Sequence, residues 1–339
     1  MKRLKRITIL VAVLVVIGWL LYFFYETLMW RVVAWRLGIP QPEYSVVVDE
    51  NVMVPMRDGI KLAADVYRPD APGWFPVIVT RTPYDKRNPD HKYEFAAKLF
   101  AMQGYVCVIQ DVRGKFDSEG DYYPYMTEAE DGHDTFEWAG AQEWSDGNVG
   151  TYGFSYWGST QWLSAPYHSD HLKAMVPIVT GQHLYERWIY NGIFRYNDVL
   201  FWHYGSTCRT HRDLEGIDLE NAVRRLPLIN ADKAMGVNIP AFNHWISHPT
   251  PDAYWDQIRV DDKVEQIKAP ALLIDGWYDY YLESMLDDFN RMVASGGSEE
   301  ARMSQIIIGP WTHEAESEFD DVDFGPEADF MQQIKTMLR

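Results

Sequence analysis

The stretch from Val149 to Thr160 constrains the fold most, because an apolar strand pattern there runs into a glycine-flanked serine and then a helix pattern. Ser155 lies between Gly153 and Gly158. A tight strand-to-helix turn lifts a serine hydroxyl above a sheet, and its strained backbone needs small neighbours. The usual pattern has glycine two places after the serine, where this chain has Trp157. The stretch favours a nucleophile elbow, and the alternative is an ordinary connection in an α/β protein.

Strand and helix patterns alternate on both sides of this stretch. Two β-rich runs joined at Met56-Arg-Asp-Gly59 predict a hairpin, because glycine suits a turn that needs positive φ. The predicted strands are 45–55, 60–67, 75–80, 105–110, 172–180, 271–274 and 305–308, and the predicted helices are 91–103, 127–141 and 282–294. Thr127 and Glu130 have the spacing of a capping box. The alternation predicts a mostly parallel sheet with right-handed crossovers.

Residues 182–262 break the alternation with aromatic-rich segments, which predict an inserted helical cap. The expected organisation is an N-terminal membrane anchor over 1–30, a linker over 31–44, a hydrolase core over 45–181 and 263–339, and the cap between the two core parts.

The anchor is predicted from an apolar run, Ile7 to Tyr25, that follows four basic residues. At helical rise the run is roughly 28 Å long, about the thickness of a bilayer core. A cleaved signal peptide is the alternative, but such peptides carry a shorter apolar region that ends in small residues. The basic cluster favours a cytoplasmic N-terminus, so we expect one helix in the lipid bilayer and the bulk of the chain periplasmic or extracellular.

The charge balance argues against nucleic-acid binding, since the formal net charge is −18 and such binding needs a cationic surface. Metal sites are weakly indicated. His244 and His248 have the spacing of a helical zinc pair, but the acid of that motif is absent and proline follows. His168 and His171 lie in a short polar turn. We therefore expect neither a metal nor a cofactor.

A serine nucleophile needs a base and a carboxylate that orients the base, and in this type of fold they follow the serine in the order acid, histidine. The strand 271–274 ends in Asp275-Gly-Trp-Tyr-Asp279, and the strand 305–308 ends in Gly309-Pro-Trp-Thr-His313. Both loops leave the sheet edge that carries the elbow. His313 is the candidate base, and Asp275 and Asp279 are both candidate acids, with Asp279 reaching farther into its loop.

With these loops included, the chain resembles the cocaine esterase-like (CocE/NonD) family of α/β hydrolases, which is related to Xaa-Pro dipeptidyl-peptidases and α-amino-acid ester hydrolases. The resemblance runs from about Val46 to the end. It rests on Met56-Arg-Asp-Gly59, Arg81-Thr-Pro-Tyr84, Asp111-Val-Arg-Gly114 with Ser118 and Gly120, Trp144-Ser-Asp-Gly147, Gly153-Phe-Ser-Tyr-Trp-Gly158, Gly276-Trp-Tyr-Asp279 and Gly309-Pro-Trp-Thr-His313. The elbow motif is the family's form, which accounts for the displaced glycine.

The resemblance implies an α/β-hydrolase fold in which Ser155 is the nucleophile, His313 the general base and then acid, and Asp279 its orienting acid. It also implies an oxyanion hole made by the Tyr84 hydroxyl and the Tyr156 backbone N–H. Candidate substrate contacts are Trp157, Trp188, Glu186 and Trp277.

Two departures from the family pattern matter. The family usually adds a β jelly-roll domain, and this chain stops at Arg339, so we expect a fragment that lacks that domain. The α-amino-acid ester branch has acids after the triad aspartate, where this chain has Tyr280 and Tyr281, so selection for a substrate ammonium is unsupported.

The leading prediction is a serine hydrolase that cleaves an ester or amide through an acyl-enzyme. The alternatives are a dipeptidyl-peptidase-like activity on Xaa-Pro peptides, and an inactive fragment or binding protein on the same fold.

Overall fold

The computed structural model describes residues 18–19, 25, 28–210, 218–319 and 321–337. The predicted anchor, Ile7 to Tyr25, lies outside the described residues except for positions 18, 19 and 25. Within the described ranges, no helix has both the length and the apolar character needed to cross a bilayer.

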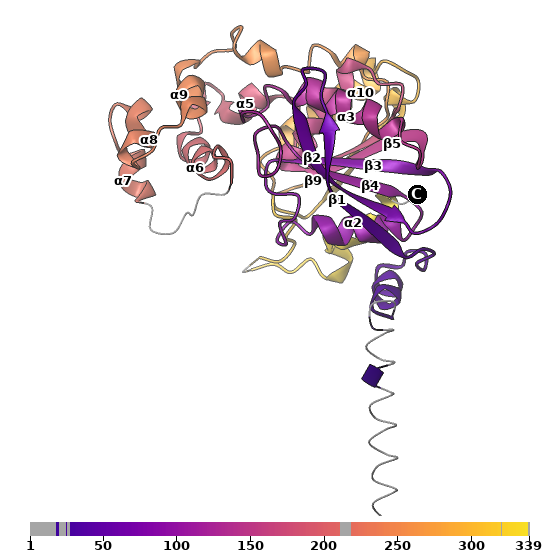
Figure 1. The fold of residues 1–339 in the computed structure, drawn as a ribbon. Helices are drawn as coiled ribbons and strands as arrows, with labels where there is room; N and C mark the ends of the chain where they lie inside the picture. The colour runs from indigo at the N-terminus through magenta and orange to yellow at the C-terminus, as the bar shows by residue number, and fades with distance from the viewer. Residues whose placement is uncertain (1–17, 20–24, 26–27, 211–217, 320, 338–339) are drawn as a thin grey trace, which may run out of the picture.

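One eight-stranded sheet forms the centre of the molecule (Figure 1), with the strand order β1-β2-β4-β3-β5-β6-β9-β10. The strands are β1 Val46–Pro55, β2 Lys61–Pro69, β3 Phe75–Thr82, β4 Val106–Asp111, β5 Ser145–Phe154, β6 Leu172–Ile178, β9 Leu272–Gly276 and β10 Gln305–Gly309. The pairs β1–β2 and β2–β4 are antiparallel, and the pairs from β4 to β10 are parallel. The predicted mostly parallel sheet is therefore confirmed.

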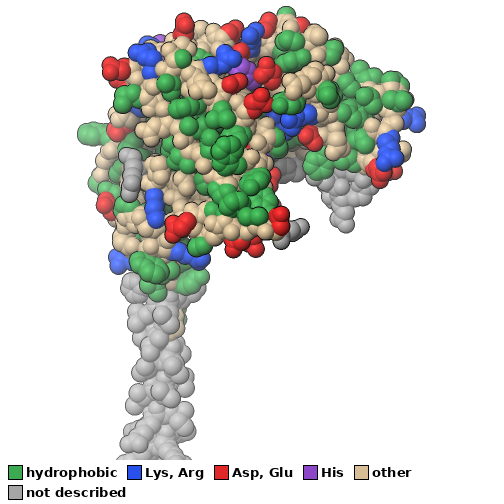
Figure 2. All heavy atoms as spheres, turned by 180° about the vertical axis from the view of Figure 1, so that it is seen from behind, with side chains coloured by type: hydrophobic (Ala, Val, Ile, Leu, Met, Phe, Trp, Pro, Cys, Tyr) green, Lys and Arg blue, Asp and Glu red, His purple; other side chains and the backbone are tan. Residues whose placement is uncertain are grey.

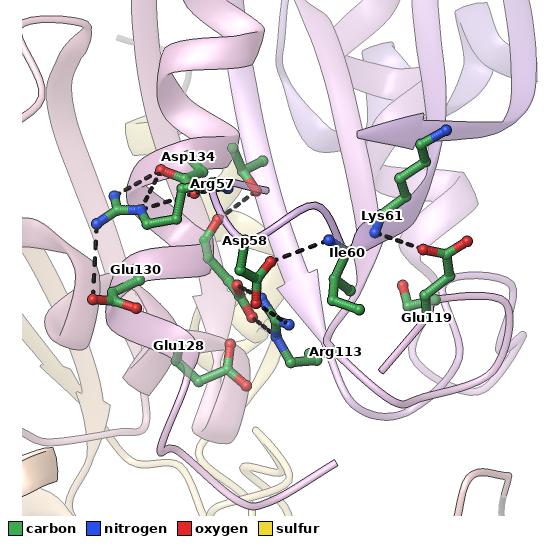
Figure 3. Close-up of polar contacts among 12 residues, drawn as sticks. Arg57, Asp58, Ile60, Lys61, Arg113, Glu119, Glu128, Glu130 and Asp134 are labelled. Carbon is green, nitrogen blue, oxygen red and sulfur yellow. Dashed lines mark hydrogen bonds and ion pairs between the residues drawn. The ribbon is translucent and has the colours of Figure 1, made fainter. Parts of the chain in front are cut away.

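The predicted hairpin turn at Met56–Gly59 is tied to distant parts of the core (Figure 3). Arg57 forms an ion pair with Asp134 at 2.7 Å, and Asp58 forms one with Arg113 at 2.7 Å. Arg113 also pairs with the buried Asp131 at 2.6 Å. Two of the sequence motifs thus hold the first hairpin against helix α3 (Glu128–Gly140).

Both faces of the sheet are buried, which explains why its inner strands read as continuous apolar runs. Along β4, Val106 and Val108 pack into one hydrophobic cluster, whereas Cys107 and Ile109 pack into another. Residues of α3, α4 (Ser155–Ser164) and α10 (Leu282–Ser295) join the first cluster. Residues of α2 (Tyr93–Ala101) join the second, and Figure 1 shows α2 on the opposite side of the sheet from α3 and α10.

The predicted capping box at the start of α3 is wrong, because the Thr127 side chain makes no capping hydrogen bond. The Thr127 backbone instead accepts from the N–H of Asp131 at 3.1 Å.

Short helices and turns occupy the chain between β6 and β9, where the sequence predicts an inserted helical cap. The elements are α5 Leu184–Trp188, β7 Ile189–Tyr190, β8 Ile193–Phe194, α6 Tyr196–Ser206, α7 Leu219–Val223, α8 Ala231–Ala234 and α9 Pro240–Ser247, with 3-10 turns at Leu228–Asn230, Trp255–Ile258 and Val264–Gln266. Figure 1 shows α6, α7, α8 and α9 gathered to one side of the sheet. Phe242 and Trp245 of α9 are fully buried and belong to the same hydrophobic cluster as one face of the sheet, so part of the aromatic content of this segment is core.

The two ends of the described chain meet on α2. Residues 28–37 are helical, and buried Trp30, Ala34 and Leu37 pack around Leu99. Met331 and Ile334 of the C-terminal segment join the same cluster. The sequence predicts a linker over 31–44, and the helix differs from it because contacts with distant segments bury this face. The C-terminal segment ends in 3-10 turns at Pro326–Ala328 and Phe330–Gln333 and in the short helix α11, Ile334–Met337.

Candidate active site

Ser155 sits at the junction of β5 and α4 in a backbone conformation that side chains rarely adopt. Its φ is +50°, in the left-handed region, and α4 begins at this residue. A Cβ on Gly153 would lie 2.3 Å from the carbonyl oxygen of Trp157, and a Cβ on Gly158 would lie 2.6 Å from Thr180. The turn therefore requires glycine at 153 and 158, which explains why the second glycine comes three places after the serine.

His313 lies between Ser155 and Asp279. Its Nε2 is 3.0 Å from the Ser155 Oγ, and its Nδ1 is 3.2 and 3.1 Å from the two carboxylate oxygens of Asp279. Because a carboxylate only accepts hydrogen bonds, this arrangement assigns the ring hydrogen to Nδ1 and leaves Nε2 to accept from the serine hydroxyl. The Asp279 side chain is fully buried and that of His313 is 17% exposed. The histidine thus reaches the surface of the site while its partner is shielded from water.

Asp275, the other acid at the end of β9, has a different environment. It is fully buried, and its Oδ1 accepts from the backbone N–H of Gly276 at 2.7 Å. Its Oδ2 has no hydrogen-bond partner in the described part of the chain. Burial, followed by the neighbouring Asp279 carboxylate, raises the pKa of Asp275 well above the ordinary range. Of the two candidate acids, Asp279 is the one in contact with the histidine.

Two hydrogen-bond donors are positioned near the serine by neighbouring elements. Tyr156 is the second residue of α4, so its backbone N–H is in the first turn, where no acceptor exists within the helix. Tyr84 follows β3 and lines the same cavity as Ser155. Burial raises the pKa of Tyr84, so its phenol keeps its hydrogen at neutral pH. The Tyr84 oxygen accepts a hydrogen bond of 3.0 Å from the Trp202 Nε1 of α6.

A buried ion pair is hydrogen-bonded to the side chain of Tyr156, the residue after Ser155. Arg81 of β3 lies 2.9 Å from the Glu128 carboxylate, and both side chains are almost fully buried. The Tyr156 hydroxyl donates to Glu128 at 2.8 Å and accepts from the Tyr125 backbone N–H at 2.9 Å. The Tyr156 side chain therefore anchors the first turn of α4 to β3 and α3.

A cavity of about 900 Å³ opens above Ser155. Ser155, His313 and Tyr84 line it, as do Trp157 and Trp188 among the candidate substrate contacts. Glu186 and Trp277 are exposed and lie outside this lining. The chemistry-bearing residues and the apolar walls thus form one site, which is the usual arrangement for a small-molecule substrate.

Several lining residues are not among the substrate contacts expected from the sequence. Arg187 of α5 and Tyr280 and Tyr281 after β9 form one part of the wall, and Phe330 and Met331 of the C-terminal segment form another. The spacing of Arg187 and Phe330 from the elbow along the chain gives no hint of contact. Tyr280 directly follows the candidate acid Asp279, and that position could have marked it.

The histidines considered for a metal are held in other contacts. His244 bonds to the Tyr123 hydroxyl at 2.8 Å, His248 to Asp252 at 2.8 Å, and His171 to the carbonyl of Gly147 at 2.8 Å. Across the residues that the structure describes, no group of three or more potential ligands is arranged to hold a metal ion.

The sheet order and the elbow, with a histidine and an acid at adjacent strand ends, define the α/β-hydrolase fold. Residues 58–315 match the family described as X-Pro dipeptidyl-peptidase (S15 family). The chain belongs to this family of S15 and CocE/NonD hydrolases.

Three relatives illustrate the match. Over 293 residues the chain is 35% identical to the cocaine esterase of Rhodococcus sp. (strain MB1 Bresler), covering 80% of this chain and 49% of that protein. A solved α-amino acid ester hydrolase is 25% identical, with a TM-score of 0.69 over 88% of this chain and 53% of that one. A CocE/NonD family hydrolase from Staphylococcus aureus is 26% identical, with a TM-score of 0.59 over 78% of this chain and 46% of that one. The chain spans about half the length of these relatives.

Proposed function

We propose that this protein is a serine hydrolase that cleaves an ester or amide bond of a small molecule through an acyl-enzyme. The observation that carries the proposal is His313, whose two ring nitrogens contact Ser155 on one side and Asp279 on the other. Serine is a weak nucleophile at neutral pH, and a base within hydrogen-bond distance is what activates it.

In the first half of the reaction, the Ser155 Oγ bonds to the carbonyl carbon while its hydrogen passes to His313 Nε2. His313 Nε2 then gives this hydrogen to the leaving alcohol or amine, whose bond to the carbonyl carbon breaks. In the second half, water gives a hydrogen to Nε2 as its oxygen bonds to the acyl carbon. The bond between that carbon and Ser155 Oγ then breaks, and Oγ takes the hydrogen from Nε2. Asp279 accepts from Nδ1 throughout and stabilises the imidazolium that forms in each half.

The negative charge that develops on the carbonyl oxygen needs donors that are already in place. We propose that the Tyr156 backbone N–H and the Tyr84 hydroxyl supply them. The first is fixed by the helix start at Ser155, and the second is a neutral phenol on the loop after the adjacent strand.

A fluorophosphonate probe tests the nucleophile. We expect it to label the wild-type chain and not Ser155→Ala, while Ser159→Ala, a serine one helical turn away, remains labelled. A well-folded wild type that resists labelling would favour a binding protein on the hydrolase fold instead.

The family match supports a second candidate, cleavage after an Xaa-Pro dipeptide. A panel of p-nitrophenyl esters set against Xaa-Pro anilides separates the two activities, since a peptidase would turn over the anilides at a rate comparable with that of the esters. The 35% identity to a protein named cocaine esterase favours the esters.

We also propose that the apolar run Ile7 to Tyr25 anchors the chain in a membrane, with the bulk outside the cytoplasm. The support is the length of the run and the four basic residues before it.

A further inference from the structure

Arg187 is a buried cation in the wall of the active-site cavity. It lies on α5, at the start of the cap, and is only 7% exposed. Its guanidinium carbon is 4.3 Å from the centre of the Trp188 ring, 3.8 Å from that of Tyr280 and 5.1 Å from that of Tyr281. Aromatic faces therefore surround the charge on several sides.

The charge has no close counterion. Nε and Nη1 are enclosed and have no hydrogen-bond partner among the described residues, and no ion pair joins Arg187 to a carboxylate there. The acid of the cavity wall that acts on it electrostatically is Asp198, which is exposed. Arginine stays protonated in proteins, so the burial of this unpaired charge is costly.

The aromatic rings compensate for only part of that cost. A ring face attracts a cation, but it does not accept the in-plane N–H bonds for which a guanidinium has five donors. Nε and Nη1 are the two guanidinium nitrogens without a hydrogen-bond partner among the described residues, and Arg187 lines the cavity. The phenol groups of Tyr280 and Tyr281 also interact with the guanidinium, but both are neutral. An anionic acceptor inside the cavity would give the guanidinium the counterion that the described residues do not supply.

Arg187 is also close to the reacting groups. The Tyr280 ring that packs against Arg187 also stacks against the His313 ring. The two ring centres are 4.5 Å apart, with an interplanar angle of 26°. The guanidinium and the histidine beside Ser155 thus contact the same aromatic ring. A second cation, Arg195, lies 6.0 Å from the centre of the same Tyr280 ring.

We propose that Arg187 binds an anionic group, a carboxylate in the first instance, carried by the substrate near its scissile ester or amide bond. This inference rests on the proposed hydrolase function and narrows its substrates to acidic ones. A planar guanidinium and a carboxylate form strong, directional hydrogen bonds, and the low-polarity surroundings of Arg187 strengthen them. Neutral substrates would leave the buried charge without a counterion.

The experiment compares esters that differ only in charge. For the acyl side we would use mono-p-nitrophenyl succinate, glutarate and adipate, each against the ester in which –CONH2 replaces the carboxylate. For the leaving-group side we would use the acetyl ester of 4-hydroxybenzoate against that of 4-hydroxybenzamide. We expect kcat/KM of the wild type to favour the acid of at least one pair by about tenfold or more, the effect of one charge-assisted hydrogen bond.

The variants assign that preference to one side chain. Arg187→Met should remove most of the preference, and Arg187→Lys, which keeps the charge without the planar fork, should retain part of it. Arg224→Met is the matched control, because Arg224 is an exposed cap arginine paired with Glu220 at 2.6 Å, and it should leave both rates unchanged. Equal rates for acid and amide in every wild-type pair, or a preference that survives in Arg187→Met, would overturn the proposal.

Two further measurements separate this proposal from the proposed function. Fluorophosphonate labelling of each variant reports whether its site is intact, so labelling without an acid preference rejects only the anion site. Calorimetric binding of mono-p-nitrophenyl glutarate and its amide counterpart to Ser155→Ala measures the same preference without turnover. It therefore decides the question even for a protein that hydrolyses nothing, and even if Arg187→Met fails to fold.

Discussion

Two acids leave the end of β9, and their surroundings give them different properties. Asp279 is in contact with His313 and also accepts from the Tyr281 backbone N–H at 3.0 Å. Asp275 is bonded to Gly276 and has one carboxyl oxygen without a partner in the described structure. The residue types alone left both as candidates, because which carboxylate meets the histidine depends on how the loop after β9 folds.

The first prediction concerns turnover. Asp279→Asn should lower kcat on the order of 10⁴-fold, because an amide can donate to Nδ1 and so favours the wrong tautomer of His313. Asp275→Asn, the matched control four residues earlier, should retain most of the activity. Steady-state kinetics on one p-nitrophenyl ester would measure both, and a larger loss in Asp275→Asn would assign the orienting role to the other acid.

The second prediction is a pH dependence of stability. The pKa of Asp275 is raised in the folded chain by burial and then by Asp279, so the folded protein keeps a proton that the unfolded chain releases above about pH 4. The contribution of Asp275 to stability is therefore present below that pH and declines as the pH rises toward the folded-state pKa. The decline has a limiting slope of about 1.4 kcal/mol per pH unit.

Asp275→Asn removes this titration. In urea unfolding, the free energy of unfolding of the variant should rise relative to that of the wild type between pH 4 and pH 8. The difference between the two should be smallest near pH 4. A constant difference over that range would mean that Asp275 is ionised in the folded protein.

The third prediction tests Tyr84. Tyr84→Phe should lower kcat by about 10²- to 10³-fold, the usual cost of removing one oxyanion donor. Tyr93→Phe removes a neighbouring phenol whose hydroxyl bonds to Thr82 at 2.6 Å, outside the lining of the main cavity, and should largely preserve kcat. Near-normal kcat in Tyr84→Phe would exclude its hydroxyl from the oxyanion hole.

At the scale of elements, the elbow depends on close packing between β5 and α4. The fourth prediction is that Gly153→Ala lowers the free energy of unfolding by about 1–3 kcal/mol and reduces fluorophosphonate labelling, since the new Cβ would overlap the Trp157 backbone. Gly150→Ala on the same strand is the control, because its Cβ would lie 3.7 Å from the nearest atom. Circular dichroism during chemical denaturation would measure both, and equal stabilities would contradict the overlap.

Elements with a strong local pattern could be predicted from the sequence. The hairpin around Gly59 and the strand before Ser155 have period-two or continuous apolar patterns and turn residues, so their existence follows from short-range chemistry. The helix over residues 28–37 could not be predicted in this way. Its buried side chains Trp30 and Ala34 face α2 and the C-terminal segment, and a local pattern carries no information about such partners.

The same distinction holds for the site. Ser155, Asp279 and His313 follow strand ends at one edge of the sheet, so topology alone predicts their proximity. The position of Arg187 depends on how the segment between β6 and β9 packs against that edge. Only the three-dimensional packing brings Arg187 beside Tyr280.

At the scale of the whole molecule, the surface is mixed in character. Figure 2 shows hydrophobic side chains gathered near the centre of the rear face, with acidic and basic groups interspersed around them. The exposed rings of Tyr278 and Phe324 and the half-buried ring of Phe319 pack against one another, with ring centres within 6.2 Å.

The fifth prediction concerns the proposed anchor. The full chain should sediment with membranes, and protease added outside spheroplasts should digest it. A chain that begins at Met29, after the apolar run, should stay in the soluble fraction. Full protection of the intact chain from external protease would contradict the proposed orientation.

A shortened form of the chain should keep residues 28–37, because this helix packs against residues of the active-site cavity. Phe95, Met331 and Ile334 contact this helix and also line the active-site cavity. A chain trimmed to begin at β1 would expose these three side chains to water and loosen one wall of the cavity. A substrate range measured on such a shortened protein would reflect the altered cavity wall and not the cavity of the untrimmed chain.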